Sequence, residues 1–235
     1  MNIKYLLLMM IMTAITIHTH GTHNKQLTKG ILIAIEGIDG SGKSTLARAL
    51  YNALQQENFD TILTREPGDS ALGKEIRELV QTQTIPISSF AEFLLFAADR
   101  AQHFAELIIP ALEQNKLIIS DRMADSSLAY QGYGRGLELQ ALRTINSWAM
   151  NKIQPHLTIF IRIPIGIALE RCRKRSTLSV FEQEQFLEKV ARGFEEIYCN
   201  RNDVIIVDGA ESLEYLTAYI YNAIQEWIRS NNLFS

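Results

Sequence analysis

Short, almost wholly apolar runs alternate along this chain with segments whose apolar residues recur at helical spacing. The runs are predicted strands, at residues 31–36, 61–65, 117–121, 157–163 and 203–207. In the segments that follow them, apolar residues return three or four positions apart, which is the spacing of one helix face. Helices are predicted over residues 45–56, 72–80, 88–112, 138–150, 183–198 and 212–227.

Strands that alternate with helices predict an α/β fold, with one five-stranded parallel sheet and helices on both of its faces. The length of 235 residues suits a single domain of this kind, and neither an internal repeat nor a low-complexity linker divides it. Within the long segment 88–112, Pro110 predicts a kink or a restart of the helix. Leu94, Leu95 and Phe96 in the same segment read as core residues.

The first 29 residues differ from this pattern. Lys4 precedes an apolar run over residues 5–17, and a polar stretch with three histidines follows. A basic start and a short apolar run are typical of a secretory signal, but no small-x-small cleavage site follows. The run is shorter than the roughly 20 residues of a membrane span. A signal or anchor, an over-long translation start and a targeting extension all remain open, and we expect residues 1–29 to lie outside the fold.

The net charge and the cysteine count argue against several classes of function. The formal net charge is −3, so no overall basic excess indicates binding to nucleic acid or to an acidic membrane. The two cysteines, Cys172 and Cys199, are too few for a disulfide framework or a cysteine metal cluster, and we expect reduced thiols.

A phosphate-binding motif follows the first predicted strand. The sequence from Gly37 to Ser44 fits G-x-x-x-x-G-K-[ST] without a mismatch and leads into a helix. Backbone N–H groups and the positive end of that helix suit the phosphates of ATP. Lys43 is expected at the β- and γ-phosphates and Ser44 on Mg²⁺. The predicted ATP-binding residues are Gly37, Ile38, Asp39, Gly40, Ser41, Gly42, Lys43, Ser44 and Thr45.

This motif alone does not distinguish a kinase from a GTPase or an ATPase. The alternative to a phosphate-binding loop is a glycine turn that merely joins the strand to the helix. Charged residues at later strand ends add information. Arg65 follows the second strand, where a guanidinium suits a phosphate, although it could pair with a helix acid instead. Asp121 ends the third strand, where P-loop enzymes place an acid near Mg²⁺, although it could simply cap the next segment. Arg122, beside it, would face the transferred phosphoryl group or the acceptor phosphate.

Two further groups are candidates. Phe96 and Arg100 lie four residues apart, so they share a helix face on which a base could stack and be hydrogen-bonded. The alternative for Phe96 is a core position. The only dense basic cluster consists of Arg171, Arg173, Lys174 and Arg175; it is either a solvated helix face or a lid that brings positive charge to the transition state.

Five segments, in this order along the chain, resemble thymidylate kinases. They are the phosphate loop E-G-I-D-G-S-G-K-S-T at 36–45, T-R-E-P-G at 64–68, L-L-F-A-A-D-R at 94–100, S-D-R at 120–122 with S-S-L-A-Y-Q-G at 126–132, and the basic cluster at 171–175. The phosphate loop has no arginine at its variable positions, which is similar to the bacterial subtype of the family, whose lid is rich in arginine.

This resemblance implies a P-loop NTPase fold with a short mobile lid over residues 30–235. It also implies ATP-dependent phosphorylation of dTMP to dTDP, with Mg²⁺ as cofactor held by Ser44 and Asp121. The implied catalytic residues are Lys43, Arg122, Arg171, Arg173 and Arg175. Substrate binding is implied for Asp39, Arg65, Pro67, Phe96, Arg100, Arg122, Ser127, Tyr130, Gln131 and Glu182.

One departure from the family pattern concerns the lid. The family often has Asp-Arg shortly before the glutamate that matches Glu182, whereas Ser179-Val180-Phe181 precede it here. The contacts of the lid therefore stay open.

By the same resemblance, the partners are the small molecules ATP and dTMP, with no nucleic acid and no stable membrane association. The family is usually a homodimer packed through helices, and the segment 88–112 could serve that contact. We expect a cytoplasmic protein, although residues 1–29 leave a targeting or anchor role open. The rival functions are a kinase for another monophosphate, a nucleotide-binding regulator without an acceptor, and a secreted or membrane-anchored binding protein suggested only by residues 1–29.

Overall fold

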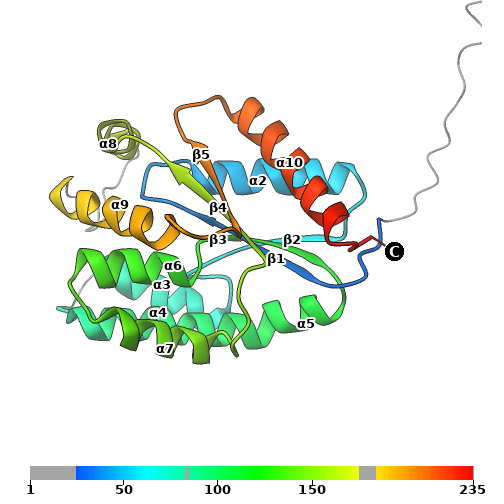
Figure 1. Cartoon of the computed structure of the whole chain (residues 1–235). Helices are drawn as coiled ribbons and strands as arrows, with labels where there is room; N and C mark the ends of the chain where they lie inside the picture. The colour runs from blue at the N-terminus through cyan, green and yellow to red at the C-terminus, as the bar shows by residue number, and fades with distance from the viewer. Residues whose placement is uncertain (1–24, 83–84, 175–183, 235) are drawn as a thin grey trace, which may run out of the picture.

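One parallel sheet forms the centre of the molecule (Figure 1). The computed structural model describes residues 25–82, 85–174 and 184–234. The strands lie in the order β2-β3-β1-β4-β5. Their bounds are β1 (Ile31–Glu36), β2 (Thr61–Arg65), β3 (Leu117–Asp121), β4 (Leu157–Arg162) and β5 (Val204–Asp208). All five predicted strands are confirmed, with ends that differ by at most one residue.

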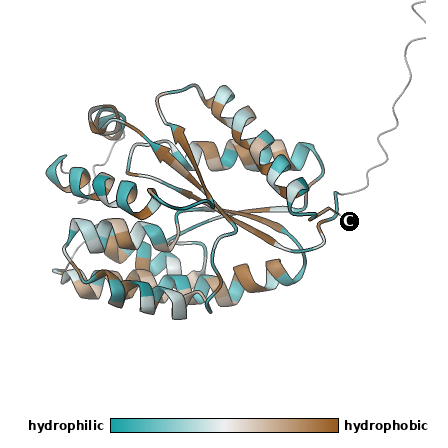
Figure 2. Cartoon of the chain, viewed as in Figure 1, coloured by the Kyte–Doolittle hydropathy of each residue, from teal (hydrophilic) through white to brown (hydrophobic). Residues whose placement is uncertain are grey.

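Helices cover both faces of this sheet. Helices α2 and α10 lie on one face, and the chain from α4 to α5 lies on the other face together with α7 and α9 (Figure 1). The strands are the most consistently apolar elements, because those in the middle are buried on both sides (Figure 2). The helices are α2 (Lys43–Gln56), α3 (Ala71–Thr82), α4 (Ser89–His103), α5 (Ile109–Glu113), α6 (Ala124–Ser127), α7 (Leu139–Ala149), α8 (Ile165–Arg173), α9 (Glu184–Tyr198) and α10 (Leu213–Ser230), with π-helical segments η1 (Phe104–Ile108) and η2 (Leu128–Gly134).

The strand register brings candidate site residues into one row. Ile35 of β1 is paired with Asp121 of β3, and Asp121 is paired with Arg65 of β2. These positions lie at the carboxyl ends of three adjacent parallel strands, which is the edge where ligands bind in open α/β sheets.

The segment 88–112 departs from a single helix. It consists of α4, the π-helical η1 and the short α5 in direct succession, with Pro110 in the first turn of α5. A proline has no N–H for the preceding turn, so the predicted restart is confirmed. The core assignment of Leu94 is wrong, because its side chain is 43% exposed, whereas Phe93 is fully buried.

The segment Leu128–Gly134 is helical although it contains two glycines, which favour turns. A Cβ on Gly134 would lie 2.7 Å from the ring of Phe186 on α9, which is too close for a side chain. This glycine therefore serves close packing between η2 and α9. The sequence pattern of a turn is overridden by a tertiary contact.

Residues just before the first strand belong to the packed part of the molecule. Lys25 donates its backbone N–H to Asn58 at 2.8 Å, and Thr28 donates to Leu233 at 3.0 Å. Leu27 is only 4% exposed and lies in the core beside α2 and α10. The packed fold thus includes residues 25–29, which the sequence had placed in the extension. Within the residues described, no helix combines the length and apolar character needed to cross a membrane.

Candidate active site

A cavity of about 1090 Å³ opens at the carboxyl edge of the sheet. Its walls come from the phosphate loop, the end of β2, helix α4 and the segment α6–η2. The predicted site residues on its lining are Asp39, Gly40, Gly42, Lys43, Ser44, Thr45, Arg65, Pro67, Phe96, Arg100, Asp121, Arg122, Ser127, Tyr130 and Gln131. Gly37, Ile38 and Ser41 belong to the same loop without lining the cavity.

The phosphate loop is packed against helix α8. Gly40 has φ +81°, and a Cβ there would lie 2.2 Å from the carbonyl oxygen of Ala168, so only glycine fits. The loop leads directly into α2, whose first residue is Lys43. Backbone N–H groups at a helix start, together with the helix dipole, favour an anion at this position.

Lys43 is buried beneath this loop. Its Nζ donates to the carbonyl oxygen of Ile38 at 2.7 Å. Burial, and then the neighbouring Arg122, lower the pKa of Lys43 to about 8. A phosphate beside Nζ would favour the charged form, since an opposite charge stabilises the ammonium group.

Ser44 and Asp121 lie together where a cation would sit. The hydroxyl of Ser44 donates to Oδ2 of Asp121. The other oxygen of that carboxylate, Oδ1, is buried and has no hydrogen-bond partner among the described residues. Hydroxyl and carboxylate oxygens are ligands that Mg²⁺ prefers, so this pair fits a magnesium ion beside the phosphate loop.

Arg122 is held by residues from three segments. Its Nη2 donates to Oδ1 of Asp39, and its Nη1 donates to Ser126 at 2.9 Å. The guanidinium also lies over the ring of Tyr130, 5.0 Å from the centroid. The backbone of Arg122 has φ +75°, a conformation that arginine seldom adopts. Strain of this kind is kept where the surroundings require it, which supports a role for this side chain in the site.

Asp39 faces two cations. Burial alone would raise the pKa of this carboxyl, but Arg122 and Lys43 lower it on balance, so Asp39 is ionised. The carboxylate thereby binds the guanidinium of Arg122 and lies within the electrostatic influence of the ammonium group of Lys43.

Glu36 is a buried residue behind the site that the sequence analysis did not assign. Its oxygens accept the backbone N–H of Met123 at 2.8 Å and that of Ser126 at 3.2 Å. Burial, reinforced by Asp125, raises the pKa of Glu36 to about 7. Glu36 thus fixes the backbone at the start of α6 and within it, just after Arg122. Its place directly before the phosphate loop was the available signal.

Arg65 and Arg77 border the cavity from the side of β2 and α3. Arg65 is 49% exposed at the side chain and lies 3.9 Å from Asp69, so the alternative pairing with an acid is also present. Arg77, which the sequence analysis missed, donates to the carbonyl oxygen of Pro67 at 2.8 Å. Its only signal in the sequence was its position in the helix that follows the T-R-E-P-G segment.

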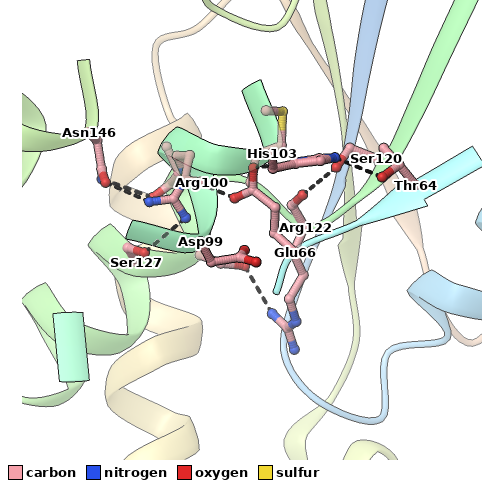
Figure 3. Close-up of polar contacts among 12 residues, drawn as sticks. Thr64, Glu66, Asp99, Arg100, His103, Ser120, Arg122, Ser127 and Asn146 are labelled. Carbon is pink, nitrogen blue, oxygen red and sulfur yellow. Dashed lines mark hydrogen bonds and ion pairs between the residues drawn. The ribbon is translucent and has the colours of Figure 1, made fainter. Parts of the chain in front are cut away.

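Phe96 and Arg100 reach the cavity from one face of α4, as their spacing predicted. Phe96 is half-buried. Arg100 is only 2% exposed, and its guanidinium donates to Glu66 at 2.8 Å, Asn146 at 2.7 Å and Ser127 at 3.2 Å (Figure 3). These bonds use three of the five N–H groups of an arginine. Asn146, on α7, gave no recognisable signal in the sequence.

Tyr130 and Gln131, in η2, line the same cavity. The amide nitrogen of Gln131 donates to Glu92 of α4 at 2.9 Å. The buried side chain of Gln131 is therefore fixed in orientation where it lines the cavity. Ser127, one turn earlier, touches Arg100 as described above.

The basic cluster begins beside the phosphate loop. A Cβ on Gly42 would lie 3.9 Å from Nη1 of Arg171, so this guanidinium is adjacent to the loop. Arg173 is exposed at the end of α8. Arg175, residues 179–181 and Glu182 lie outside the described residues.

A parallel sheet in this strand order, with a phosphate loop after its central strand, defines a P-loop NTPase. Besides the loop, the cavity is lined by Arg65 and Arg122, which give it positive charge beyond that of Lys43 and suit a second bound phosphate.

Comparisons with known proteins identify the family of P-loop NTPases to which the chain belongs. The family model for thymidylate kinase matches residues 35–220, and the chain belongs to the thymidylate kinase family. A protein named thymidylate kinase from Halothermothrix orenii is 41% identical over 202 residues, covering 84% of this chain and 97% of that protein. Another of that name, from Desulfovibrio desulfuricans, is 40% identical and covers 85% of this chain and 97% of its own length.

Proposed function

We propose that this chain transfers the γ-phosphoryl group of ATP to dTMP and so forms dTDP. One observation carries the proposal: a single cavity is bordered by the phosphate loop with Lys43 and also by two further arginines, Arg65 and Arg122. A nucleotide regulator without an acceptor has no need of that second set of cations. The names of the relatives support the choice of a thymidine nucleotide.

Transfer is in line between the two bound nucleotides. The backbone of the phosphate loop and Lys43 hold the donor, and the lid arginines Arg171, Arg173 and Arg175 supply charge to the transferring group. Lid closure would also exclude water, which would otherwise compete as acceptor. The lid role of Arg171 is supported by its place beside Gly42.

The acceptor phosphate is already largely ionised near neutral pH, so no strong base is required. Arg65 and Arg122 orient that phosphate, and Asp39 holds Arg122 in place. Mg²⁺ would be held by Ser44 and Asp121 and, when bound, would neutralise charge on the phosphates of ATP.

We assign recognition of the base and of the sugar to the part of the cavity that is lined by α4 and η2. Phe96 stacks on thymine, and Arg100 donates to an exocyclic oxygen of the ring. Ser127 and Gln131 lie beside the base, and Tyr130 packs on the deoxyribose, where it disfavours a 2′-hydroxyl. Pro67 contributes to the wall, and Glu182 is assigned to the nucleotide sugar by its position in the sequence alone.

An acceptor panel tests the proposal. With ATP and Mg²⁺, catalytic efficiency should fall in the order dTMP, dUMP, dCMP. Cytosine places an amino group where thymine has an oxygen, so a buried donor of Arg100 would face a donor, at a cost of roughly 1–3 kcal/mol. That corresponds to about ten- to a hundredfold in efficiency. Uracil loses only a methyl group, worth about 1 kcal/mol. Equal turnover with and without every monophosphate would refute the kinase assignment.

Arg100→Met should reduce the thymine–cytosine ratio more than the thymine–uracil ratio. An unchanged thymine–cytosine ratio in this variant would show that the base is read elsewhere.

We further propose a cytoplasmic homodimer. A mostly apolar hollow is lined by Leu79 of α3, Ile85 of the following loop, and Leu94 and Leu95 of α4, and the side chains of Ile85 and Leu94 are exposed there. Exposed apolar patches of this kind mark protein contacts. Residues 1–24 are assigned to an extension outside the catalytic domain, and a targeting or anchor role for them stays open.

A further inference from the structure

A buried ion cluster lies immediately behind the base end of the cavity (Figure 3). Both oxygens of Glu66 are engaged by side chains of α4: Oε2 accepts from Nε of Arg100 at 2.8 Å, and Oε1 is 3.0 Å from Nδ1 of His103. All three residues are nearly inaccessible, and His103 is only 1% exposed. Arg100 borders the cavity, whereas His103 is absent from its lining.

We propose that His103 is a positioning residue for acceptor specificity: it fixes the carboxylate of Glu66, which in turn fixes the guanidinium of Arg100 against the base. The inference rests on the role proposed above for Arg100.

The hydrogen-bond partners of His103 require that both of its ring nitrogens donate. Its Nε2 lies 2.7 Å from Oγ1 of Thr64, and that hydroxyl donates to Oδ2 of Asp69 at 2.6 Å. A threonine hydroxyl carries one hydrogen, and a carboxylate only accepts. Thr64 therefore donates its one hydroxyl hydrogen to Asp69. Its oxygen can then only accept, so Nε2–H of His103 donates to it. On the other side, Nδ1–H donates to Glu66.

Glu66 is ionised in this arrangement. Burial alone would raise the pKa of Glu66, but Arg100 and His103 lower it on balance. The charged groups that face the imidazole are Glu66 itself, Asp69 reached through Thr64, and the neighbouring Asp99 and Arg100 of its own helix. The carboxylate of Glu66 thus accepts from two cations, Arg100 and His103, and charge-assisted bonds of this kind are short and directional.

The imidazole of His103 can affect the position of Arg100 without contacting it, because both side chains bind Glu66. Without a donor at Nδ1, one oxygen of Glu66 loses its partner, and the carboxylate can rotate about its last side-chain bond. The guanidinium of Arg100 would then be held firmly only by Asn146 and Ser127, and its Nε would lose a fixed partner. Because catalytic and binding groups need placement to within fractions of an ångström, such freedom weakens recognition of the base without removing any group that touches it.

The same cluster joins the two halves of the acceptor site. Thr64 and Glu66 flank Arg65, which is assigned to the acceptor phosphate, and His103 binds both flanking side chains. The ATP side shares none of these contacts. A defect at His103 should therefore be confined to the acceptor.

Two substitutions separate the ring nitrogens. In His103→Asn, the amide nitrogen takes the place of Nδ1, since both are bonded to Cγ. In His103→Gln, the amide lies nearer the place of Nε2. We would measure kcat and KM for dTMP, dCMP and ATP, together with the melting temperature, in both variants and in Arg100→Met.

His103→Gln should raise the KM for dTMP and lower the dTMP-to-dCMP efficiency ratio by about tenfold, while the KM for ATP changes by less than about twofold. His103→Asn should recover most of that ratio at a similar melting temperature. Nitrogen NMR of the ring in the intact protein should show both nitrogens protonated.

Equal ratios in wild type and His103→Gln, alongside a reduced ratio in Arg100→Met, would overturn the inference for His103 and leave the role of Arg100 standing. Equal losses in the Asn and Gln variants that follow the melting temperature would also overturn it, because they would indicate a purely structural role. An unchanged ratio in Arg100→Met would instead refute the proposed base contact itself.

Discussion

Tyr130 and Asp39 are hydrogen-bonded to one another twice. The tyrosine hydroxyl accepts the backbone N–H of Asp39 at 3.0 Å and donates to its carboxylate at 2.9 Å. Asp39 lies in the phosphate loop and Tyr130 in η2, and Arg122 binds both of them. The donor side and the acceptor side of the cavity are thereby connected through one tyrosine oxygen.

Tyr130→Phe should reduce catalytic efficiency with dTMP by about ten- to a hundredfold. The substitution removes the hydroxyl but keeps the ring, so Asp39 loses a partner at its buried backbone N–H and another at its carboxylate. A buried group left without its hydrogen bond costs roughly 1–3 kcal/mol. Steady-state kinetics with varied dTMP would measure the loss.

Tyr133→Phe is the matched control, because Tyr133 belongs to the same helical segment but is not part of the cavity lining. It should retain wild-type efficiency. Similar losses in both variants would indicate damage to η2 and not to the contact with Asp39.

Lys43→Ala should lower kcat by at least about a hundredfold, which is the usual loss when a group that stabilises transition-state charge is removed. The melting temperature should stay the same or rise. Burial lowers the pKa of Lys43, which means that the folded protein disfavours its charged form. Kinetics and calorimetry on Lys43→Ala would check both points, with the exposed Lys189→Ala as control. Normal turnover in a folded Lys43→Ala protein would remove the phosphate loop from the mechanism.

Asp99→Asn should change the pH dependence of stability. Burial, and then Glu66, raise the pKa of Asp99 from 3.8 to about 6, so the folded state binds the proton more tightly than the unfolded state does. The free energy of unfolding of the wild type should therefore fall as pH rises from about 4 to about 6. Asparagine does not titrate, so that component should be absent from the variant.

Urea unfolding at pH 4.5 and pH 7.5 would measure the effect. The stability of Asp99→Asn relative to wild type should improve by on the order of 1 kcal/mol between the two values. Asp69→Asn is the control, since Asp69 lies at the exposed end of the same network. A relative stability that is constant with pH would contradict the prediction.

Truncation should separate two parts of the amino-terminal region. Deleting residues 1–24 should leave activity and unfolding free energy unchanged. Deleting residues 1–29 also removes Leu27 from the core and the backbone bonds of Lys25 and Thr28. That deletion should cost about 2–4 kcal/mol while the site stays active below the melting temperature. Equal stability of the two truncated proteins would show that residues 25–29 contribute nothing to the packing.

Leu94→Lys should weaken the proposed dimer, because it places a charge in the apolar hollow lined by Leu79, Ile85, Leu94 and Leu95. Analytical ultracentrifugation should show a lower mass at micromolar concentration than for wild type. Tyr215→Lys is the control, since Tyr215 is exposed on α10, which lies on the opposite face of the sheet from α4 (Figure 1). A monomeric wild type would contradict the assembly itself.

Local sequence determined the sheet and the phosphate loop. Each strand is a short apolar run bounded by polar or glycine residues, so its position depends on neighbours that are adjacent in the chain. The loop from Gly37 to Ser44 is also contiguous, and its glycines and Lys43 define its chemistry without reference to the rest of the protein. The row formed by Arg65 and Asp121 followed from the rule that the ends of parallel strands meet at one edge.

The partners of the site residues were decided by tertiary structure. The bonds of Arg100 reach residues that are 27, 34 and 46 positions away, and the bond between Glu36 and Met123 spans 87. No periodicity within one segment records which distant segment will pack against it. The helical form of η2 has the same origin, since contact with α9 outweighs the local preference of its glycines for a turn. Sequence thus located the residues that face the nucleotides, whereas packing between distant segments selected the residues that hold them in place.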